Sequence, residues 1–313
     1  MSDGKLTRTI ARFQAKIDSG SYYEAHQTLR TITNRYVKSK QYQDAVEILY
    51  QGSIILTKNK QYASSSDLIS YMIQVYIEAG ITSQNKEAKL KLIELIGALP
   101  DTEKSLIDLS KQSLNWSKVD NEANKFGDCD LHTLFGTKLL STVGSSDDPS
   151  KLFAITELHL ILGNHESLPK YVDFLYDWYL ENPTVDAGLF LSRAVINYSY
   201  LKNVKFVDEC VSRYISKLKA SNAKFEQITH NELSIDFFPE HPLLNFLQLL
   251  VATIHKEDSS NKFYGLYNEY KGDLEEYGII SSVEYIGKLY FGLNLGKPKG
   301  GNMMANLLGD FFK

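Results

Sequence analysis

The densest group of potential metal ligands lies at residues 128–132, where Asp128, Cys129, Asp130 and His132 follow one another closely. Carboxylate, thiolate and imidazole groups are the usual ligands of zinc. In a helix, residues one and two positions apart point in different directions, so only Asp128 and His132 would share a face. Two ligands do not complete a zinc site. We therefore expect Asp128 to cap a helix and His132 to be half-buried, with no metal bound.

A second candidate, for phosphate binding, is the Gly296–Lys297 dipeptide near the C-terminus. In a nucleotide-binding loop the lysine is followed by Ser or Thr, but here Pro298 occupies that position, and the first glycine of the motif is misplaced. The pattern therefore argues against a nucleotide site. We expect no cofactor.

The two cysteines and the remaining histidines give little indication of catalysis. Cys129 and Cys210 fall on apolar stripes, and nothing near them predicts a lowered thiol pKa, so both are expected in the core. His159 and His165 lack metalloprotease spacing. A Cys–His pair assembled by folding stays open. Overall the residues predict a protein that is not an enzyme.

Charge is distributed unevenly along the 313 residues. Residues 1–60 hold ten Lys/Arg and five Asp/Glu, a local charge of +5, which leaves −9 for the remainder of a chain whose net charge is −4. A basic end on an acidic body predicts an acidic partner at that end, although a solvated helix face would look the same. Nucleic acid is disfavoured, because its backbone would need basic charge along the whole surface. No apolar run is long enough to span a bilayer, and no secretory signal is recognised, so we expect a cytosolic protein without membrane insertion.

The basic charges have helical spacing. Arg8, Arg12 and Lys16 are four residues apart and would form a ridge on the first helix, and Arg30 and Arg35 would extend it along the second. Arginine can bind a carboxylate through two parallel hydrogen bonds, so such a ridge suits an acidic protein surface. Ser64 to Asp67 reads as the start of a fourth helix, where Asp67 would cap the free N–H groups and add an acidic point near the ridge.

These residues must be positioned by a chain of similar helices. The pattern Tyr22/Glu24/Ala25 recurs as Tyr42/Asp44/Ala45, each time at the start of a helical apolar stripe. Helices too small to bury their own apolar faces must stack on their neighbours. We predict an all-α fold, an α-solenoid of TPR-like hairpins with about fourteen helices, and one small β-hairpin near 225–238. We expect one continuous solenoid with an N-terminal half, 1–148, and a C-terminal half, 149–313.

A resemblance to a known family appears in the same region. The stretch R-T-I-A-R-F-Q-A-K-I-D-S-G-S-Y-Y-E-A-H-Q-T-L-R-T-I-T-N-R-Y-V, from Arg8 to Val37, resembles the opening of the fungal helical adaptor of guided entry of tail-anchored proteins (the GET pathway). The mammalian relative belongs to the ubiquitin-like, Bag-containing pre-targeting complex. Looser similarity continues through four further segments: 125–128, 163–165, 171–173 and 245–250.

The resemblance implies a non-catalytic α-solenoid that acts as a bridge. In this family the N-terminal helices dock on a dimeric targeting ATPase, and the C-terminal half holds a ubiquitin-like-domain protein. That protein recruits the co-chaperone carrying the tail-anchored client, so client transfer toward the ER membrane becomes effectively intramolecular. On this basis Asp67 matches an acidic position that modulates the ATPase.

The resemblance and the residue patterns together assign two sets of partner-binding residues. The expected ATPase face comprises Arg8, Arg12, Lys16, Glu24, His26, Arg30, Arg35 and Asp67. The expected face for the ubiquitin-like protein comprises Ile235, Phe237, Phe238, Leu243 and Leu247, although the leucines would equally suit a core.

Two other interpretations fit the sequence less well. A helical-repeat scaffold subunit of the proteasome lid or of a translation factor would usually end in a winged helix, which the Gly-rich C-terminal region does not resemble. A stacked-helix enzyme of the prenyltransferase type would show paired acidic motifs facing a cavity, and none is found. For the adaptor, deletion of residues 1–60 is expected to abolish ATPase binding and spare the ubiquitin-like partner.

Overall fold

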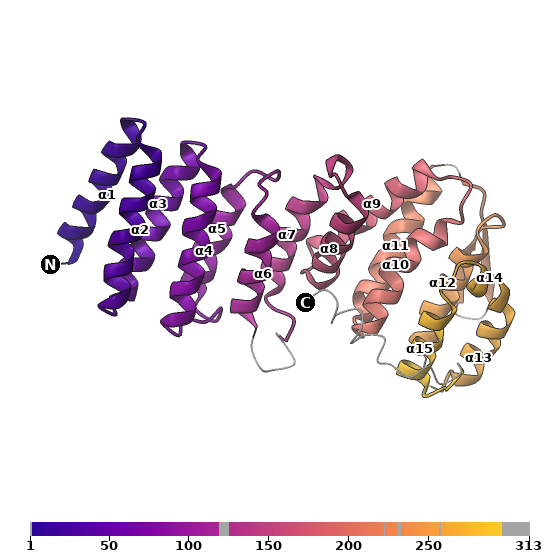
Figure 1. Cartoon of the computed structure of the whole chain (residues 1–313). Coiled ribbons are helices and arrows are strands. Elements are labelled where there is room, and N and C mark those ends of the chain that lie inside the picture. The colour runs from indigo at the N-terminus through magenta and orange to yellow at the C-terminus, as the bar shows by residue number, and fades with distance from the viewer. Residues whose placement is uncertain (1, 119–124, 222, 231–232, 257, 296–313) are drawn as a thin grey trace. The chain divides into compact units, whose positions relative to one another are not determined.

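The computed structural model describes residues 2–118, 125–221, 223–230, 233–256 and 258–295. Within these residues the chain forms fifteen α-helices, one short 3-10 helix and one two-stranded antiparallel sheet (Figure 1). The predicted all-α class with a small hairpin is confirmed, and the expected number of about fourteen helices is close. The chain divides into two compact units, residues 1–164 and 165–313.

The first unit is built from helices that each pack on the next one or two along the chain. In Figure 1 they follow one another in a row, in antiparallel pairs. The elements are α1 (Ser2–Asp18), α2 (Tyr22–Lys38), α3 (Tyr42–Lys58), α4 (Tyr62–Glu78), α5 (Lys86–Ala98), α6 (Leu106–Ser117), α7 (Cys129–Leu140), η1 (Val143–Ser145) and α8 (Pro149–Leu162).

A spacing of twenty residues organises α2, α3 and α4. Each helix has 17 residues and begins at a tyrosine, Tyr22, Tyr42 or Tyr62. The tripeptide K-Q-Y at 40–42 returns at 60–62, and this repeat predicts the start of α4 better than the serines at 64–66 do. The expectation that Ser64 to Asp67 caps the fourth helix is therefore wrong. Asp67 lies in the second turn, where the backbone N–H groups are already bonded within the helix.

The turns between these helices share one backbone conformation. Gly20, Lys40 and Lys60 all have positive φ, at 77°, 57° and 59°. The following residue donates its N–H to the carbonyl five positions earlier, as Gln41 does to Tyr36 at 2.9 Å. This is the Schellman pattern that satisfies the free carbonyls at a helix end, and glycine is the residue that adopts it without strain.

Lys40→Gly should therefore stabilise the first unit by about 0.5–1 kcal/mol, because relief of the left-handed lysine outweighs the extra entropy of glycine. Lys38→Gly is the matched control. It removes the same charge two residues earlier, inside the last turn of α2, and should cost about 0.5–1 kcal/mol. Urea unfolding of both variants measures the difference. Equal changes for the two variants would contradict the argument.

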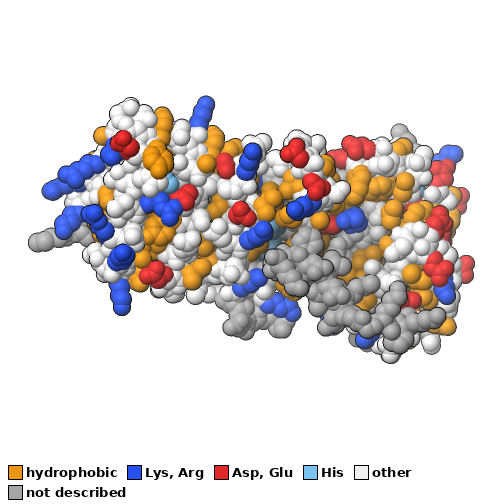
Figure 2. Space-filling view, in the orientation of Figure 1, with side chains coloured by type: hydrophobic (Ala, Val, Ile, Leu, Met, Phe, Trp, Pro, Cys, Tyr) orange, Lys and Arg blue, Asp and Glu red, His pale blue; other side chains and the backbone are white. Residues whose placement is uncertain are grey.

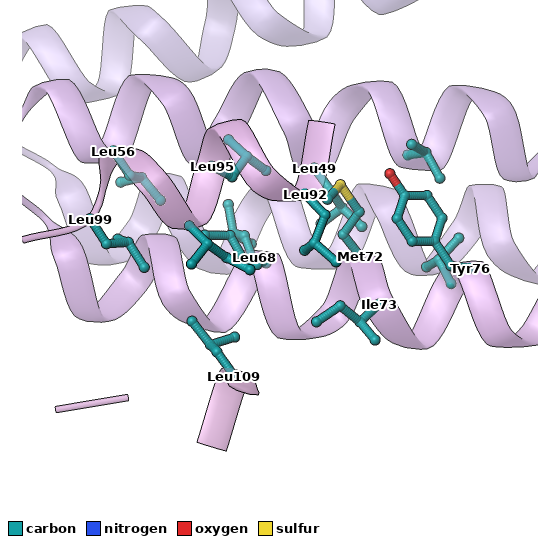
Figure 3. Close-up of a cluster of buried hydrophobic side chains, with 14 of the residues drawn as sticks. Leu49, Leu56, Leu68, Met72, Ile73, Tyr76, Leu92, Leu95, Leu99 and Leu109 are labelled. Atoms are coloured by element: carbon teal, nitrogen blue, oxygen red, sulfur yellow. The ribbon is translucent and has the colours of Figure 1, made fainter. Parts of the chain in front are cut away.

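The core of the first unit runs without a break from Phe13 to Leu139. Figure 3 shows its centre, where side chains from α3, α4, α5 with its C-cap Leu99, and α6 meet: Leu49, Leu56, Leu68, Met72, Ile73, Tyr76, Leu92, Leu95, Leu99 and Leu109. Tyr76 also stacks on Trp116, with 5.2 Å between ring centroids. The indole N–H of Trp116 donates to the carbonyl of Ile81 at 2.7 Å, so the loop before α5 is attached to the same core.

The second unit surrounds α10, which packs on helices before and after it in the chain. Its elements are α9 (Ser167–Glu181), α10 (Ala187–Tyr200), α11 (Val204–Ala220), β1 (Glu226–His230), β2 (Leu233–Phe237), α12 (Pro242–Ile254), α13 (Ser260–Glu269), α14 (Lys271–Glu276) and α15 (Ile280–Phe291). The strands pair with Glu226 opposite Phe237 and Ile228 opposite Ile235. The predicted hairpin near 225–238 thus has the expected position.

The boundary between the units comes later than the expected break at 148/149. Pro149 begins α8, as its fixed φ suits a first helical turn, but α8 packs on α7 and belongs to the first unit. Residues 144–150, next to the expected break, belong to η1 and to the start of α8, whose N-cap is Asp148.

Asp186 joins the N-termini of α10 and α12 in the second unit. Its buried carboxylate accepts hydrogen bonds from the N–H of Gly188 at 2.7 Å and of Leu243 at 2.8 Å. Burial raises the pKa of this carboxyl, and the backbone N–H groups oppose that shift. One side chain therefore satisfies free donors of two helices. It holds α10 and α12 close together at Gly188.

Candidate functional site

The basic face of the first unit is carried mainly by α1 and the second half of α2. Arg8, Arg12 and Arg35 are exposed, and Figure 2 shows Lys and Arg side chains gathered over this end. None of these three guanidinium groups forms an ion pair or side-chain hydrogen bond with a described residue. Their charge is therefore available for an acidic partner.

Lys16 and Glu24 occupy the opposite end of the α1–α2 pair. The ammonium of Lys16 donates to the Thr28 hydroxyl at 3.1 Å and lies 3.8 Å from the Glu24 carboxylate. An exposed ion pair of this kind contributes at most about 1 kcal/mol. Lys16 is thus partly neutralised, and the ridge is weaker at this end than the residue spacing predicts.

The structure brings together three of the predicted docking residues from two helices. Both carboxylate oxygens of Asp67 on α4 accept from a single nitrogen, Nη1, of Arg30 on α2, each at 2.5 Å. His26, one turn before Arg30, lies 2.7 Å from the same carboxylate through its Nε2. The Arg30 guanidinium also lies over the Tyr71 ring, 5.2 Å from its centroid.

This cluster changes the role of Arg30. Its side chain and that of Asp67 are each 39% exposed, so both are accessible at one side while paired at the other. The positive charge of Arg30 is compensated by Asp67, so Arg30 does not extend the free basic ridge as expected. Burial raises the pKa of the Tyr71 phenol, which stays neutral beneath the guanidinium. Gln74, one turn beyond Tyr71, is exposed and carries no charge.

The second predicted face divides into a surface part and a core part. Ile235 and Phe237 on β2 are half-buried, whereas Phe238, Leu243 and Leu247 are fully buried. The last three therefore offer no exposed surface in this structure; of the two interpretations left open by the sequence, the leucines follow the core one. Apolar residues following a hairpin are buried here because α12 packs on both β2 and α10.

The hairpin is fastened to α12 by two amide side chains. Asn245 accepts from the Phe238 N–H at 2.9 Å and donates to its carbonyl at 2.8 Å. Gln248 makes the same reciprocal pair with Asp236, at 3.1 and 2.8 Å. These bonds fix the strand whose half-buried side chains were predicted to contact a partner.

Two exposed apolar residues of the hairpin were not among the predicted partner contacts. Phe225 is 38% exposed and Ile228 is 44% exposed. The partial alternation of apolar and polar residues in this segment could have indicated Ile228, because residues two apart share a face of a strand. Among the described residues, these are the apolar side chains most accessible around the hairpin.

The chemical candidates of the sequence have structural roles. The Asp128 carboxylate caps α7 by accepting from the N–H groups of Asp130 and Leu131, as predicted. Lys89 binds both Asp128 and Asp130, at 3.1 and 2.9 Å. No group of three or more potential metal ligands is found among the described residues. The acidic cluster therefore serves to join α5 to α7.

His132 is completely buried rather than half-buried, because α8 covers it. Its Nδ1 lies 3.0 Å from Nδ1 of His159 on α8, and its Nε2 lies 3.1 Å from the Phe126 carbonyl. Burial lowers the pKa of His132 to about 4 and that of His159 to about 3. Both imidazoles are therefore neutral at physiological pH and serve as polar core residues.

The thiols have no features of a nucleophile. Partial desolvation of the sulfur, together with Asp130 and Asp128, raises the pKa of Cys129, and full burial raises that of Cys210. Cys210 is buried as expected, but Cys129 is exposed and corrects the expectation of a core position. A raised pKa disfavours the reactive thiolate.

Comparison with known proteins identifies the family. The model of the family described as Golgi to ER traffic protein 4 matches residues 39–312. This chain belongs to the Golgi to ER traffic protein 4 family. It is 32% identical to Golgi to ER traffic protein 4 of Aspergillus fumigatus, covering 98% of this chain and 89% of the relative. It is 30% identical to that of Schizosaccharomyces pombe, covering 99% of this chain and 95% of the relative.

The fold agrees with a solved member of the Golgi to ER traffic protein 4 family. The crystal structure of C. therm. Get4 is similar with a TM-score of 0.81 and 27% identity, covering 99% of this chain and 96% of that chain. The resemblance carried by Arg8 to Val37 is confirmed, and the family model extends it to nearly all residues after 38. Among the described residues no helix is both long and apolar enough to cross a bilayer.

Proposed function

We propose that this chain is a cytosolic, non-catalytic adaptor that bridges a dimeric targeting ATPase and a ubiquitin-like-domain protein. The co-chaperone carrying the client would join through the latter, and the client would pass toward insertion into the ER membrane. Membership of the Golgi to ER traffic protein 4 family implies a role in guided entry of tail-anchored proteins. To this family role we add two candidate partner surfaces, one on the first unit and one on the second.

The observation that supports ATPase docking is the set of unpaired guanidinium groups on the first two helices. Arg8, Arg12 and Arg35 are exposed and have no acidic partner among the described residues. An acidic surface would pair with them at little desolvation cost and would be steered toward them at long range. The Arg30–Asp67 pair joins α2 to α4 on the same unit and offers the partner both an acid and a base. Lys16, Glu24 and His26 complete this docking face.

For the ubiquitin-like partner, the second unit offers the outer side of the β1–β2 hairpin. Among the hairpin side chains that the structure describes, Ile228 and Phe225 are the most accessible apolar ones, next to the half-buried Ile235 and Phe237. The outer edge of β2 is bonded to Gln248 at Asp236, whereas β1 pairs only with β2 in the described sheet. A strand edge with apolar neighbours, such as that of β1, can accept an extended peptide. Phe238, Leu243 and Leu247 then support this surface from beneath.

A charge reversal at Arg12 tests the ATPase face. Arg12→Glu should weaken ATPase binding at least about tenfold, because it replaces an attraction by a repulsion at the interface. Lys58→Glu is the matched control: it reverses an exposed charge at the far end of α3, outside the docking face. Affinity measured from 50 to 300 mM salt should fall steeply for the wild type and less steeply for Arg12→Glu.

Equal weakening by both reversals, or affinity independent of salt, would refute docking through this face. Point variants are the sharper test, because the first 60 residues include α3. The side chains of Leu49 and Leu56 are fully buried in the core of the first unit. Deleting residues 1–60 would remove these contacts and damage the fold of that unit as well as the surface.

A further inference from the structure

A polar hollow of about 590 Å³ opens at one end of the first three helices. It is lined by Gly4, Lys5, Arg8, Arg35, Tyr36, Ser39, Gln41 and Asp44. Because α1 and α2 are antiparallel, the first half of α1 meets the last turns of α2 here, while Lys16 and Glu24 meet at the other end. The hollow is therefore separate from the Lys16–Glu24 contact and from the Arg30–Asp67 pair.

The charge of the hollow is unbalanced. Among the described lining residues, Lys5, Arg8 and Arg35 contribute three positive charges and Asp44 one negative charge, which leaves +2. The three cationic side chains form no ion pair with any described residue. Cations that share a concave site repel one another and raise the local potential, so a bound anion with more than one charge would relieve that repulsion.

The donors around the hollow suit phosphate oxygens. Two guanidinium groups can each present two parallel N–H bonds to a phosphate, and Lys5 adds a mobile ammonium. The hydroxyl of Tyr36 and the amide of Gln41 add neutral donors, whereas the Ser39 hydroxyl already donates to the Arg35 carbonyl at 2.8 Å. The Gln41 side chain makes no capping hydrogen bond to the first turn of α3, so it is not committed to that turn.

Size and polarity narrow the ligand class. A volume of about 590 Å³ is within the range of small-molecule sites and exceeds what one carboxylate group would fill. Tyr36 is the aromatic residue among the described lining residues, and apart from Gly4 the others have polar or charged side chains, so no aliphatic side chain lines a slot for an acyl chain. We propose that this hollow binds a small soluble oligophosphate, a ligand that carries two or more phosphate groups.

The test titrates the isolated chain with pyrophosphate and with inositol hexakisphosphate by calorimetry at 150 mM salt. We expect saturable binding at one site. Arg35→Gln and Lys5→Gln should each weaken it at least about tenfold, since each removes charge-assisted bonds. Lys58→Gln, which removes an exposed charge from the far end of α3, should change the affinity less than about twofold.

Absence of saturable binding, or equal loss in Lys58→Gln, would overturn the proposal. Vesicles containing 5% phosphatidylinositol bisphosphate distinguish the source of the phosphate. Sedimentation with these vesicles but no binding of inositol hexakisphosphate would overturn a soluble ligand in favour of a lipid headgroup. The ATPase is absent from this titration, so a negative result would leave the proposal of ATPase docking unaffected. Lys5 is not one of the residues assigned to the ATPase face, so Lys5→Gln tests the hollow alone.

Discussion

Gly188→Ala is expected to destabilise the second unit by about 3 kcal/mol, because the added methyl group would overlap backbone atoms of a neighbouring helix. A Cβ at Gly188 would lie 2.3 Å from the backbone N of Leu244 and 2.6 Å from the carbonyl carbon of Leu243. Backbone atoms at a helix start cannot rotate away as a flexible side chain can. The added methyl group must therefore separate α10 from α12, where Asp186 holds both N-termini.

The measurement can be made specific to this unit. The chain has two tryptophans, and Trp178 packs against Phe190 of α10 with 5.5 Å between ring centroids. In a Trp116→Phe background, urea unfolding followed by fluorescence reports the environment of Trp178. Gly265→Ala is the matched control, because a Cβ there meets nothing within 4 Å and α13 should gain about 0.5–1 kcal/mol. A loss below about 0.5 kcal/mol for Gly188→Ala would show that the two helices can separate freely.

The first unit should lose about 4 kcal/mol of stability between pH 7 and pH 5 because of His132 and His159. An unfolded histidine has a pKa of about 6.5, whereas the folded values are about 4 and about 3. Between these limits the unfolded chain binds protons that the folded unit does not. Each histidine then costs up to about 1.4 kcal/mol per pH unit, and the stability is fully present only above the unfolded pKa.

Trp116 fluorescence in a Trp178→Phe background would follow this loss, since Trp116 stacks in the core of the first unit. His159→Gln should reduce the pH-dependent loss to about half, because one titrating group is removed while a polar side chain remains opposite His132. His165→Gln should leave it unchanged, because His165 is exposed and lies in the second unit. Stability that is constant from pH 7 to pH 5 would contradict burial of the pair.

Local patterns in the sequence predicted much of the fold. The Tyr22 and Tyr42 repeats, the Asp128 cap and the hairpin near 225–238 all have the expected positions. Each depends on residues a few positions apart, whose backbone preferences are expressed whatever the rest of the chain does. The start of α4 was predicted at the wrong residue, although a local pattern, the repeated K-Q-Y tripeptide, indicates the correct start at Tyr62.

The candidate site was less predictable, because its residues are far apart in the chain. Asp67 was expected at a helix cap, yet it binds Arg30, 37 residues away, and His26, 41 residues away. The helical spacing of Arg30 shows which face it occupies but not which neighbouring helix supplies a carboxylate. Packing of α2 on α4 determines that partner, and it removes one charge from the free basic ridge.

The sequence by itself determined the helical class, the repeat length and the excess of positive charge at the N-terminal end, because these follow from composition and short-range spacing. Tertiary structure alone decided which cations stay unpaired, which apolar side chains of 235–247 face solvent and which histidines are buried away from solvent. Those outcomes depend on the close approach of segments tens of residues apart. Pairing and burial are properties of that contact, and neither partner encodes them alone.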